Sequence, residues 1–152
     1  MGKPSLKAIF GMLLPALILA GCSRDPQTGA FGLRTTTLTL QGTPLKVEVA
    51  DTAQSLETGL MFRSSMPEDH GMLFILGSAE QASFWMKNTK IPLSIAYIDG
   101  NGVVREEHDM MPFDEHTTRS SSDQIYYALE VNQGWFQRHH VEPGVKVQGI
   151  PR

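Results

Sequence analysis

The chain has 152 residues, of which 41% are hydrophobic and 19% are charged, and its formal net charge is −3 at pH 7. This length suits a single domain with a core of its own. The mildly acidic composition, with no cluster of Lys or Arg, argues against a nucleic-acid-binding protein. Cys22 is the only cysteine, so no disulfide can form within the chain and burial must hold the fold together.

The first segment has the features of a bacterial lipoprotein signal peptide. Lys3 and Lys7 flank the start of an apolar run at residues 8–20, which is too short to span a bilayer as a stable helix. The run leads into Leu19-Ala20-Gly21-Cys22, the lipobox pattern of small residues before a cysteine that becomes acylated. We therefore predict that residues 1–21 are a signal peptide. The alternative is an ordinary secretory signal in which Cys22 is incidental.

Acylation of Cys22, with palmitate among the acyl chains, would anchor the protein to a membrane without spanning it. Ser23 rather than Asp follows Cys22, which favours transport to the outer membrane and a position on its periplasmic face. Residues 22–32 are polar and contain Pro and Gly, so we predict a lipid-anchored tether. The folded domain is then expected over residues 33–152.

The rest of the chain shows the patterns of short β-strands. Alternating or continuous apolar runs, separated by Gly, Pro, Asn and Asp, predict about eight of them. We expect these strands at residues 37–40, 45–49, 72–76, 84–87, 93–98, 103–107, 125–131 and 145–150. In the second strand, Lys46 and Glu48 alternate with apolar residues, which indicates a hairpin with one face in water.

Two short helices complete the prediction. Asp51 can cap the first, and Gly59 can end it. Asn132 can cap the second, which carries Trp135 and Phe136. The polar segment at residues 106–123 is expected to be a long loop. Together these elements predict a mainly β (α+β) fold, a small antiparallel barrel or sandwich with helices plugging one end.

Several motifs stand in a characteristic order and spacing. The most specific block is Phe-Trp-Met-Lys-Asn-Thr at residues 84–89, and the others are 59–63, 66–67, 71–74, 91–93, 97–99, 128–132 and 134–135. With these motifs the sequence, from about Leu38 to Val147, resembles one family, the domain of unknown function numbered 192 (DUF192), which comprises small exported bacterial and archaeal proteins. The resemblance implies a compact, mainly β fold with short helices and brings no established activity. The segment from His108 to Ser122 is more polar and longer than the family pattern.

Polar and aromatic residues within the most patterned block, residues 59–99, are the candidates for ligand binding. An apolar wall with a few convergent polar groups is what a small-molecule pocket needs. The candidates, which include one residue from a later strand, are Arg63, Asp69, Trp85, Lys87, Asn88, Asp99 and Glu130. The alternative is structural, because buried charges need partners. In that interpretation Lys87 pairs with Glu130, Arg63 pairs with Asp69, and Asn88 caps a turn.

A copper site is a second hypothesis. Thioether and imidazole groups select Cu(I), and His108, Met110, Met111 and His116 lie close together in the polar segment. The alternative is that the acidic, His-bearing segment is only solvated. Its carboxylates could also bind Ca²⁺, but the spaced Asp and Asn residues of a calcium loop are not present. Apart from this copper hypothesis, no cofactor is expected.

Catalytic motifs are not recognisable in the sequence. It contains no G-x-S-x-G, S-x-x-K or H-E-x-x-H, so we favour a binding protein over an enzyme. The leading hypothesis is a non-enzymatic cell-envelope lipoprotein that binds a small ligand or an envelope protein partner. The alternatives are a periplasmic Cu(I)-binding accessory protein that uses Met and His, and an envelope hydrolase acting on a polysaccharide or peptidoglycan fragment.

Replacing Cys22 with Ala should release the protein from the membrane fraction and abolish its labelling by palmitate, because the acylated thiol is gone. Ser23→Ala is the matched control and should change neither property. Both are measured by fractionating and labelling bacterial cells that express the full chain. A Cys22→Ala protein that stays in the membrane and still takes up palmitate would contradict the lipobox assignment.

Overall fold

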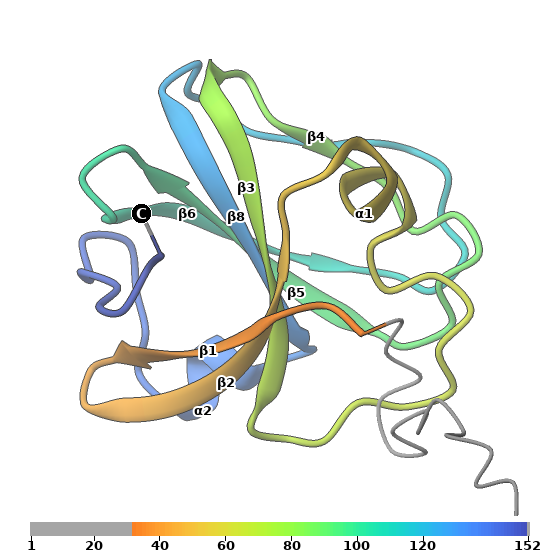
Figure 1. The fold of residues 1–152 in the computed structure, drawn as a ribbon, viewed down its shortest axis with the longest axis horizontal. Coiled ribbons are helices and arrows are strands. Elements are labelled where there is room, and N and C mark those ends of the chain that lie inside the picture. Colours follow the sequence, from red (N-terminus) through yellow and green to blue (C-terminus); the bar gives the residue numbers. More distant parts are fainter. Residues whose placement is uncertain (1–31, 152) are drawn as a thin grey trace, which may run out of the picture.

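The computed structural model describes residues 32–151 and has a mainly β fold (Figure 1), which confirms the predicted fold class. Eight strands and two short helices are present in these residues. They are β1 (Thr35–Leu40), β2 (Thr43–Ala50), α1 (Ala53–Thr58), β3 (His70–Glu80), β4 (Ser83–Phe84), β5 (Leu93–Asp99), β6 (Val104–Met110), β7 (Thr118–Arg119), β8 (Ile125–Asn132) and α2 (Trp135–Arg138).

Six of the strands form one sheet in the order β1-β2-β3-β8-β5-β6, and β4 and β7 form a separate pair. Within the described residues the large sheet is open, so it is not a closed barrel. It is also mixed, because β2 and β3 pair in parallel while the other neighbours are antiparallel. A parallel pair needs a crossover of a dozen or more residues. The crossover here is residues 51–69, which contain α1.

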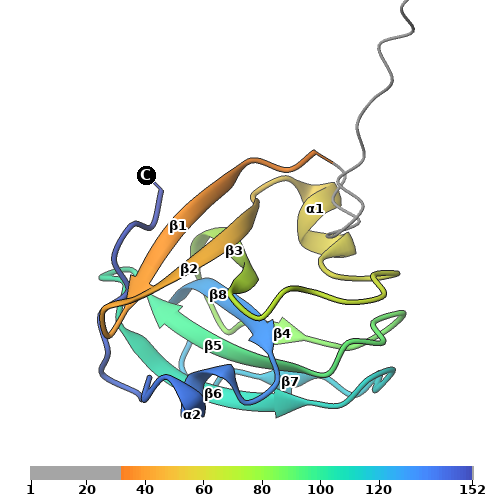
Figure 2. The same ribbon diagram turned by 90° about the horizontal axis from the view of Figure 1, so that it is seen from below.

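The C-terminal segment lies beside both edges of the sheet rather than forming the strand predicted at residues 145–150 (Figure 2). It makes isolated bridges instead, between Thr39 and Gln148 and between Val103 and Lys146. Gly149 adopts a left-handed φ of 84°, which interrupts an extended strand. The segment therefore links the β1 edge to the β6 edge without continuing the ladder.

The sheet is covered on both faces. One face packs Leu73, Ala96 and Leu129 against Trp135 and Phe136 of α2. Because successive residues of a strand point to opposite faces, their neighbours form a second core beneath α1 and the loops. This second core includes Met72, Phe74, Met86, Ile91, Ile95, Tyr97 and Ala128. Burial on both faces explains why every residue of β5 is buried.

A single row of residues crosses the centre of the second face. Glu48 of β2 lies opposite Met72 of β3, and Met72 lies opposite Glu130 of β8. Both glutamates are buried. The prediction that Glu48 faces water is therefore wrong, because the later half of β2 is covered on both faces. The sheet register brings the two carboxyl groups onto one buried face.

The ends of the helices differ from the prediction by one or two residues. Thr52 rather than Asp51 caps α1, in a capping box with Ser55, since the Asp51 carboxylate accepts hydrogen bonds from Arg34. Gly59 ends the helix as predicted. Gly134 precedes α2 in place of Asn132, whose side-chain amide donates to two carbonyl groups of the loop before β3.

Three loops project from one end of the molecule, below α1 in the sequence-coloured ribbon (Figure 2). The Phe62 N–H donates to the Asn88 carbonyl, and the Phe113 N–H donates to the Thr89 carbonyl. The strand predicted at residues 84–87 ends at Phe84, because the chain turns here with Asn88 in a left-handed conformation. The loop predicted at residues 106–123 contains the end of β6 and all of β7.

Replacing Gly149 with Ala should destabilise the domain by more than the same change at Gly144. Both glycines have positive φ, which costs an alanine about 1–2 kcal/mol. A Cβ at Gly149 would also lie 2.5 Å from the Thr37 carbonyl oxygen, whereas a Cβ at Gly144 meets nothing within 4 Å. We expect about 1–3 kcal/mol of further destabilisation at Gly149.

Urea unfolding of the two variants measures the difference. Equal losses of unfolding free energy would show that the C-terminal segment is not packed against β1.

Candidate ligand pocket above Glu130

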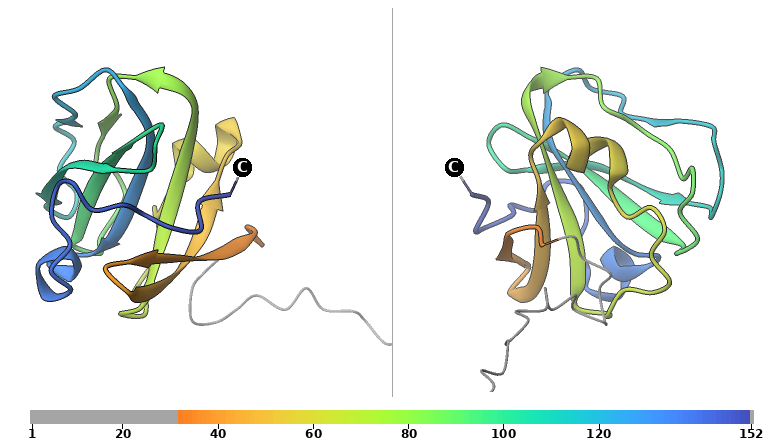
Figure 3. Two further views of the ribbon diagram at one scale, coloured as in Figure 1. Left: turned by 90° about the vertical axis from the view of Figure 1, so that its left-hand side faces the viewer. Right: turned by 45° about the vertical axis from the view of Figure 1, so that its right-hand side comes forward.

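A pocket of about 410 Å³ lies between α1, the far part of β3, and β4 with the residues after it. The helix α1 comes forward in the right-hand view of Figure 3. The lining residues are Ala53, Leu56, Glu57, Thr58, Gly59, Met61, Phe74, Leu76, Glu80, Ser83, Phe84, Trp85, Thr89, Thr117 and Glu130. The volume is within the range of about 300–1,000 Å³ that is usual for small-molecule sites.

Aromatic side chains shape one wall of this pocket. The Phe84 ring stands edge-on to Phe74, with their centroids 4.9 Å apart, and it also contacts Tyr97. These contacts fix Phe84 where β4 ends. Trp85 follows outside the strand and remains 37% exposed, so its indole is available at the pocket.

Glu130 is the one lining residue that is both charged in type and buried. It lies in the middle of β8, between Leu129 and Val131, and is 4% exposed. Within residues 32–151 its carboxyl group forms no side-chain hydrogen bond. Burial raises the pKa of Glu130 to about 8, although the nearby Arg63 acts in the opposite direction. The carboxyl therefore carries a proton at neutral pH.

The Arg63 guanidinium is already engaged by Glu48. It donates two hydrogen bonds to the two oxygens of that carboxylate, the longer of 2.8 Å, and both residues are buried. One cation thus faces two carboxyl groups, and Glu48 holds it in a bidentate pair. This explains why Arg63 cannot keep Glu130 ionised at neutral pH.

Two structural pairings predicted from the sequence are wrong. Arg63 pairs with Glu48 and not with Asp69, which is exposed and bonds to the neighbouring His70 at 2.9 Å. That hydrogen bond lowers the pKa of Asp69. Lys87 does not pair with Glu130 either, because its ammonium group lies over the Trp85 ring, 5.0 Å from the centroid.

The pocket rim is acidic. Glu57 of α1 and Glu80 of β3 contribute exposed carboxylates to the lining. Among the described residues that line the pocket there is no Lys, Arg or His. The acidic groups of this site are therefore three: two exposed carboxylates at the rim and the protonated carboxyl of Glu130 at the base.

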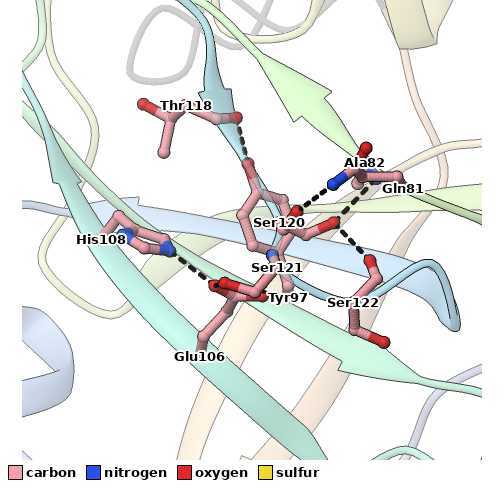
Figure 4. Close-up of polar contacts among 9 residues, drawn as sticks. All are labelled: Gln81, Ala82, Tyr97, Glu106, His108, Thr118, Ser120, Ser121 and Ser122. Atoms are coloured by element: carbon pink, nitrogen blue, oxygen red, sulfur yellow. Dashed lines mark hydrogen bonds and ion pairs between the residues drawn. The ribbon is translucent and has the colours of Figure 1, made fainter.

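The wall that includes Thr117 is fastened to the sheet (Figure 4). The Tyr97 hydroxyl donates to the Thr118 carbonyl at 2.6 Å, and the Ser120 hydroxyl accepts from the Ala82 N–H at 2.9 Å. The Ser121 N–H donates to the Glu106 carboxylate at 2.7 Å. Part of the segment predicted to be a loop is thus a fixed wall.

The serine and histidine of this network do not form a catalytic triad. The Ser121 hydroxyl and the His108 ring both bond to Glu106, each at 3.0 Å. A carboxylate stands between them, whereas nucleophilic catalysis needs the imidazole on the hydroxyl. Burial acts to raise the pKa of Glu106, but the hydrogen bonds from Ser121 and His108 outweigh it, so the pKa is lowered. The cluster holds β7 in place.

The four candidate metal ligands are in different surroundings. Met110 is buried in the core opposite Leu93, while Met111 is exposed. His108 is bonded to Glu106, and His116 is exposed and bonded to Asp114. No group of three or more His, Cys, Asp or Glu residues suited to a metal occurs within residues 32–151. The structure does not bring these four side chains together as one site.

Two further candidates have structural contacts. Asp99 is buried, accepts hydrogen bonds from the N–H groups of Asn101 and Val103, and pairs with Arg105 at 2.9 Å, so it stabilises the turn between β5 and β6. Asn88 is exposed, and its backbone carbonyl accepts a hydrogen bond from the Phe62 N–H. Of the seven ligand candidates, only Trp85 and Glu130 line the pocket.

Sequence reasoning missed Glu48, Glu57 and Glu80. A signal for Glu48 exists, because Val47-Glu48-Val49 has the same form as Leu129-Glu130-Val131. In both cases a glutamate stands alone between β-branched or aliphatic residues. Glu57 and Glu80 carry no comparable signal, since exposed glutamates are common on helices and strand ends.

The sequence matches the profile of DUF192, described as an uncharacterised ACR, over residues 36–149. It is similar to a solved structure from Sinorhizobium meliloti described as a candidate transcription regulator. The identity is 35% and the TM-score 0.74, with 77% of this chain and 95% of that one covered. It is also similar to a protein of unknown function from Novosphingobium aromaticivorans, at 31% identity and a TM-score of 0.74, covering 78% and 88%. Comparison with curated proteins gave no match.

Glu130 should make the domain less stable as the pH rises. Its pKa is about 8 in the folded state against 4.5 for a free glutamate, so the folded state binds the proton more tightly. The stabilisation is complete below pH 4.5 and is lost as the pH rises through 8. Relative to Glu130→Gln, the wild type should lose up to about 1.4 kcal/mol per pH unit in this window.

Urea unfolding at pH 5, 6, 7 and 8 measures the difference between the two proteins. Glu115→Gln, an exposed change outside the pocket, should keep the wild-type slope. A Glu130→Gln variant with that same slope would refute the raised pKa.

Proposed function

Because the chain belongs to the DUF192 family, whose description names no activity, we propose a function from the pocket itself. The protein binds a small organic ligand, without converting it, in the pocket above Glu130. Glu130 is the polar anchor of the ligand, and Trp85 with Phe84 contacts its apolar part.

The observation that carries this proposal is the carboxyl of Glu130, which makes no hydrogen bond within residues 32–151 and reaches the pocket from an otherwise buried position. The one fully buried side-chain atom without a partner in these residues is Oε2 of Glu107, which does not line the pocket. Most buried polar groups in folded proteins have a partner, and each exception needs an explanation. Glu130 lacks one within residues 32–151 and lines a pocket of about 410 Å³. A ligand that supplies the missing hydrogen bond accounts for both features.

The cellular setting of this function is part of the same proposal. The lipobox sequence supports an envelope protein anchored through Cys22 on the periplasmic face of the outer membrane. The signal peptide, Cys22 and nearly all of the predicted tether lie outside the described residues. In residues 32–151 no helix has the length and apolarity needed to cross a membrane.

An envelope protein is the alternative partner. Phe62, Met111 and Phe113 are large apolar side chains that remain mostly exposed, and they lie on the projecting loops. Exposed apolar groups of this kind favour contacts with another protein. The pocket remains the stronger basis for a function, because it offers a specific polar anchor.

We do not propose a role in transcription regulation, the description given to the Sinorhizobium meliloti structure, for this chain. The net charge of this chain is −3, and four of its arginines are paired with carboxylates. Binding to nucleic acid depends on free cations that face the phosphates. The copper hypothesis has less support than the pocket for a different reason, since its candidate ligands are separated between core and solvent.

A hydrolase acting on an envelope polysaccharide is the second candidate. It is favoured by Glu130 itself, because a buried carboxyl that keeps its proton at neutral pH can serve as a general acid. Glu57 or Glu80 would supply the second carboxylate that glycoside hydrolysis needs. The two candidates differ in one result: a binding protein returns its ligand unchanged, whereas a hydrolase returns products that mass spectrometry detects.

Replacing Leu56 with Trp should abolish ligand binding, because the larger side chain on α1 fills the pocket. Gln54→Trp is the matched control, since Gln54 is on the same helix but does not line this pocket. Binding is measured by screening small organic fragments against the full chain with ligand-observed NMR and Trp85 emission. Fragments that bind the wild type and Leu56→Trp equally well would contradict the proposed site.

A further inference from the structure

We infer that the pocket selects ligands that combine a positively charged amine with an apolar body. This inference rests on the proposed function and specifies its ligand class. It follows from three features of the described residues: an unpartnered carboxyl at the base, an aromatic wall, and an acidic rim.

The base of the pocket lacks a counter-charge. Glu130 is 96% buried, and the nearest cation, Arg63, is held by Glu48 through two hydrogen bonds. The other ionisable group that faces Glu130 is the Tyr97 hydroxyl, which donates to the Thr118 carbonyl. No described side chain is thus free to neutralise a Glu130 carboxylate. An ammonium group entering the pocket would supply both the charge and the hydrogen-bond donors.

The wall suits the rest of such a ligand. Phe74, Phe84 and Trp85 present apolar surface, and the Trp85 ring already attracts a cation, since the Lys87 ammonium lies 5.0 Å from its centroid. Positive groups are stabilised over an indole face by its electron-rich surface. The wall therefore accepts an apolar ring or alkyl chain that carries a positive charge.

The rim disfavours anions. Glu57 and Glu80 place negative charge at the entrance, and no Lys, Arg or His joins them among the described lining residues. A cleft lined by one sign of charge raises the local concentration of ligands of the opposite sign. A carboxylate ligand would be repelled by the two rim carboxylates and would meet no positively charged side chain among the described lining residues.

Binding of an amine should be coupled to proton release. At neutral pH Glu130 is protonated, and an adjacent ammonium favours its ionised form. The proton passes from Glu130 to the solvent, and the amine keeps its own. A neutral ligand would instead accept a hydrogen bond from the protonated carboxyl and release no proton.

Three probes of one shape test the inference: benzylamine, benzyl alcohol and benzoate. They share a ring that fits the aromatic wall and differ in the charge of the head group. Titrated into the full chain at pH 7 and followed by NMR, benzylamine should bind at least tenfold more tightly than either of the others. Calorimetry in two buffers of different ionisation enthalpy should show a proton released with benzylamine alone.

Glu130→Gln should remove the tenfold preference, because the amide cannot ionise but keeps the size of the side chain. Glu80→Gln, at the exposed rim, should weaken benzylamine binding by about two- to threefold, and added salt should mask this loss. Glu115→Gln is the control outside the pocket and should bind as the wild type does.

The outcomes separate the two levels of the proposal. Benzyl alcohol or benzoate binding in the pocket as tightly as benzylamine would overturn the ligand class and leave the pocket as a binding site. A preference for benzylamine that survives in both Glu130→Gln and Leu56→Trp would overturn the assignment to this pocket. If no probe and no fragment of any charge binds, the proposed function itself fails.

Discussion

The buried guanidinium of Arg63 is the constraint on which the site depends. A charge at this depth is costly unless it is paired and hydrogen-bonded, and Glu48 meets that need through both carboxylate oxygens. The pair requires β2 and the segment before β3 to meet on one face of the sheet. The crossover through α1 provides this arrangement and also places α1 over the same face. Glu130 lies in the same row, two strands further across the sheet, and its carboxyl is left without a described cation that is free to pair with it.

The loops around this face are held by backbone contacts rather than by a large core. Phe62, Asn88 and Phe113 all adopt left-handed conformations, which cost non-glycine residues about 1–2 kcal/mol each. Such strain persists only where surrounding contacts enforce it. Here the loops exchange N–H to carbonyl bonds with one another. Their arrangement leaves Trp85 at the pocket and the Phe62 and Phe113 rings in solvent, which is the opposite of what apolar burial alone would select.

The positions of most strands and helices could be predicted from the sequence, but the contacts between distant side chains could not. Apolar runs bounded by turn residues located β5 and β8, and the Gly59 stop of α1 was correct. Trp85 and Glu130 are candidates from the sequence that do line the pocket. The partner of Arg63 could not be found in this way. Glu48 is 15 residues away along the chain, and its burial follows from a parallel pairing that local alternation does not encode. The short β4, likewise, reflects backbone contacts of Asn88 and Thr89 with other loops, which local propensity does not contain.

The protonated state of Glu130 gives this pocket two modes of recognition. With its proton, the carboxyl is a neutral donor that suits an uncharged oxygen of a ligand. Without its proton, the same group is an anion in a poorly solvated place, where its electrostatic attraction to a cation is stronger than it would be in water. The aromatic wall accepts both an uncharged and a positively charged ligand, so it contributes to affinity more than to selectivity. The acidic rim favours the cation in both states. Selection between ligands therefore lies with the charge at Glu130. Burial sets that charge by raising the pKa of the carboxyl, and the Arg63 guanidinium, which Glu48 already holds, opposes this only in part.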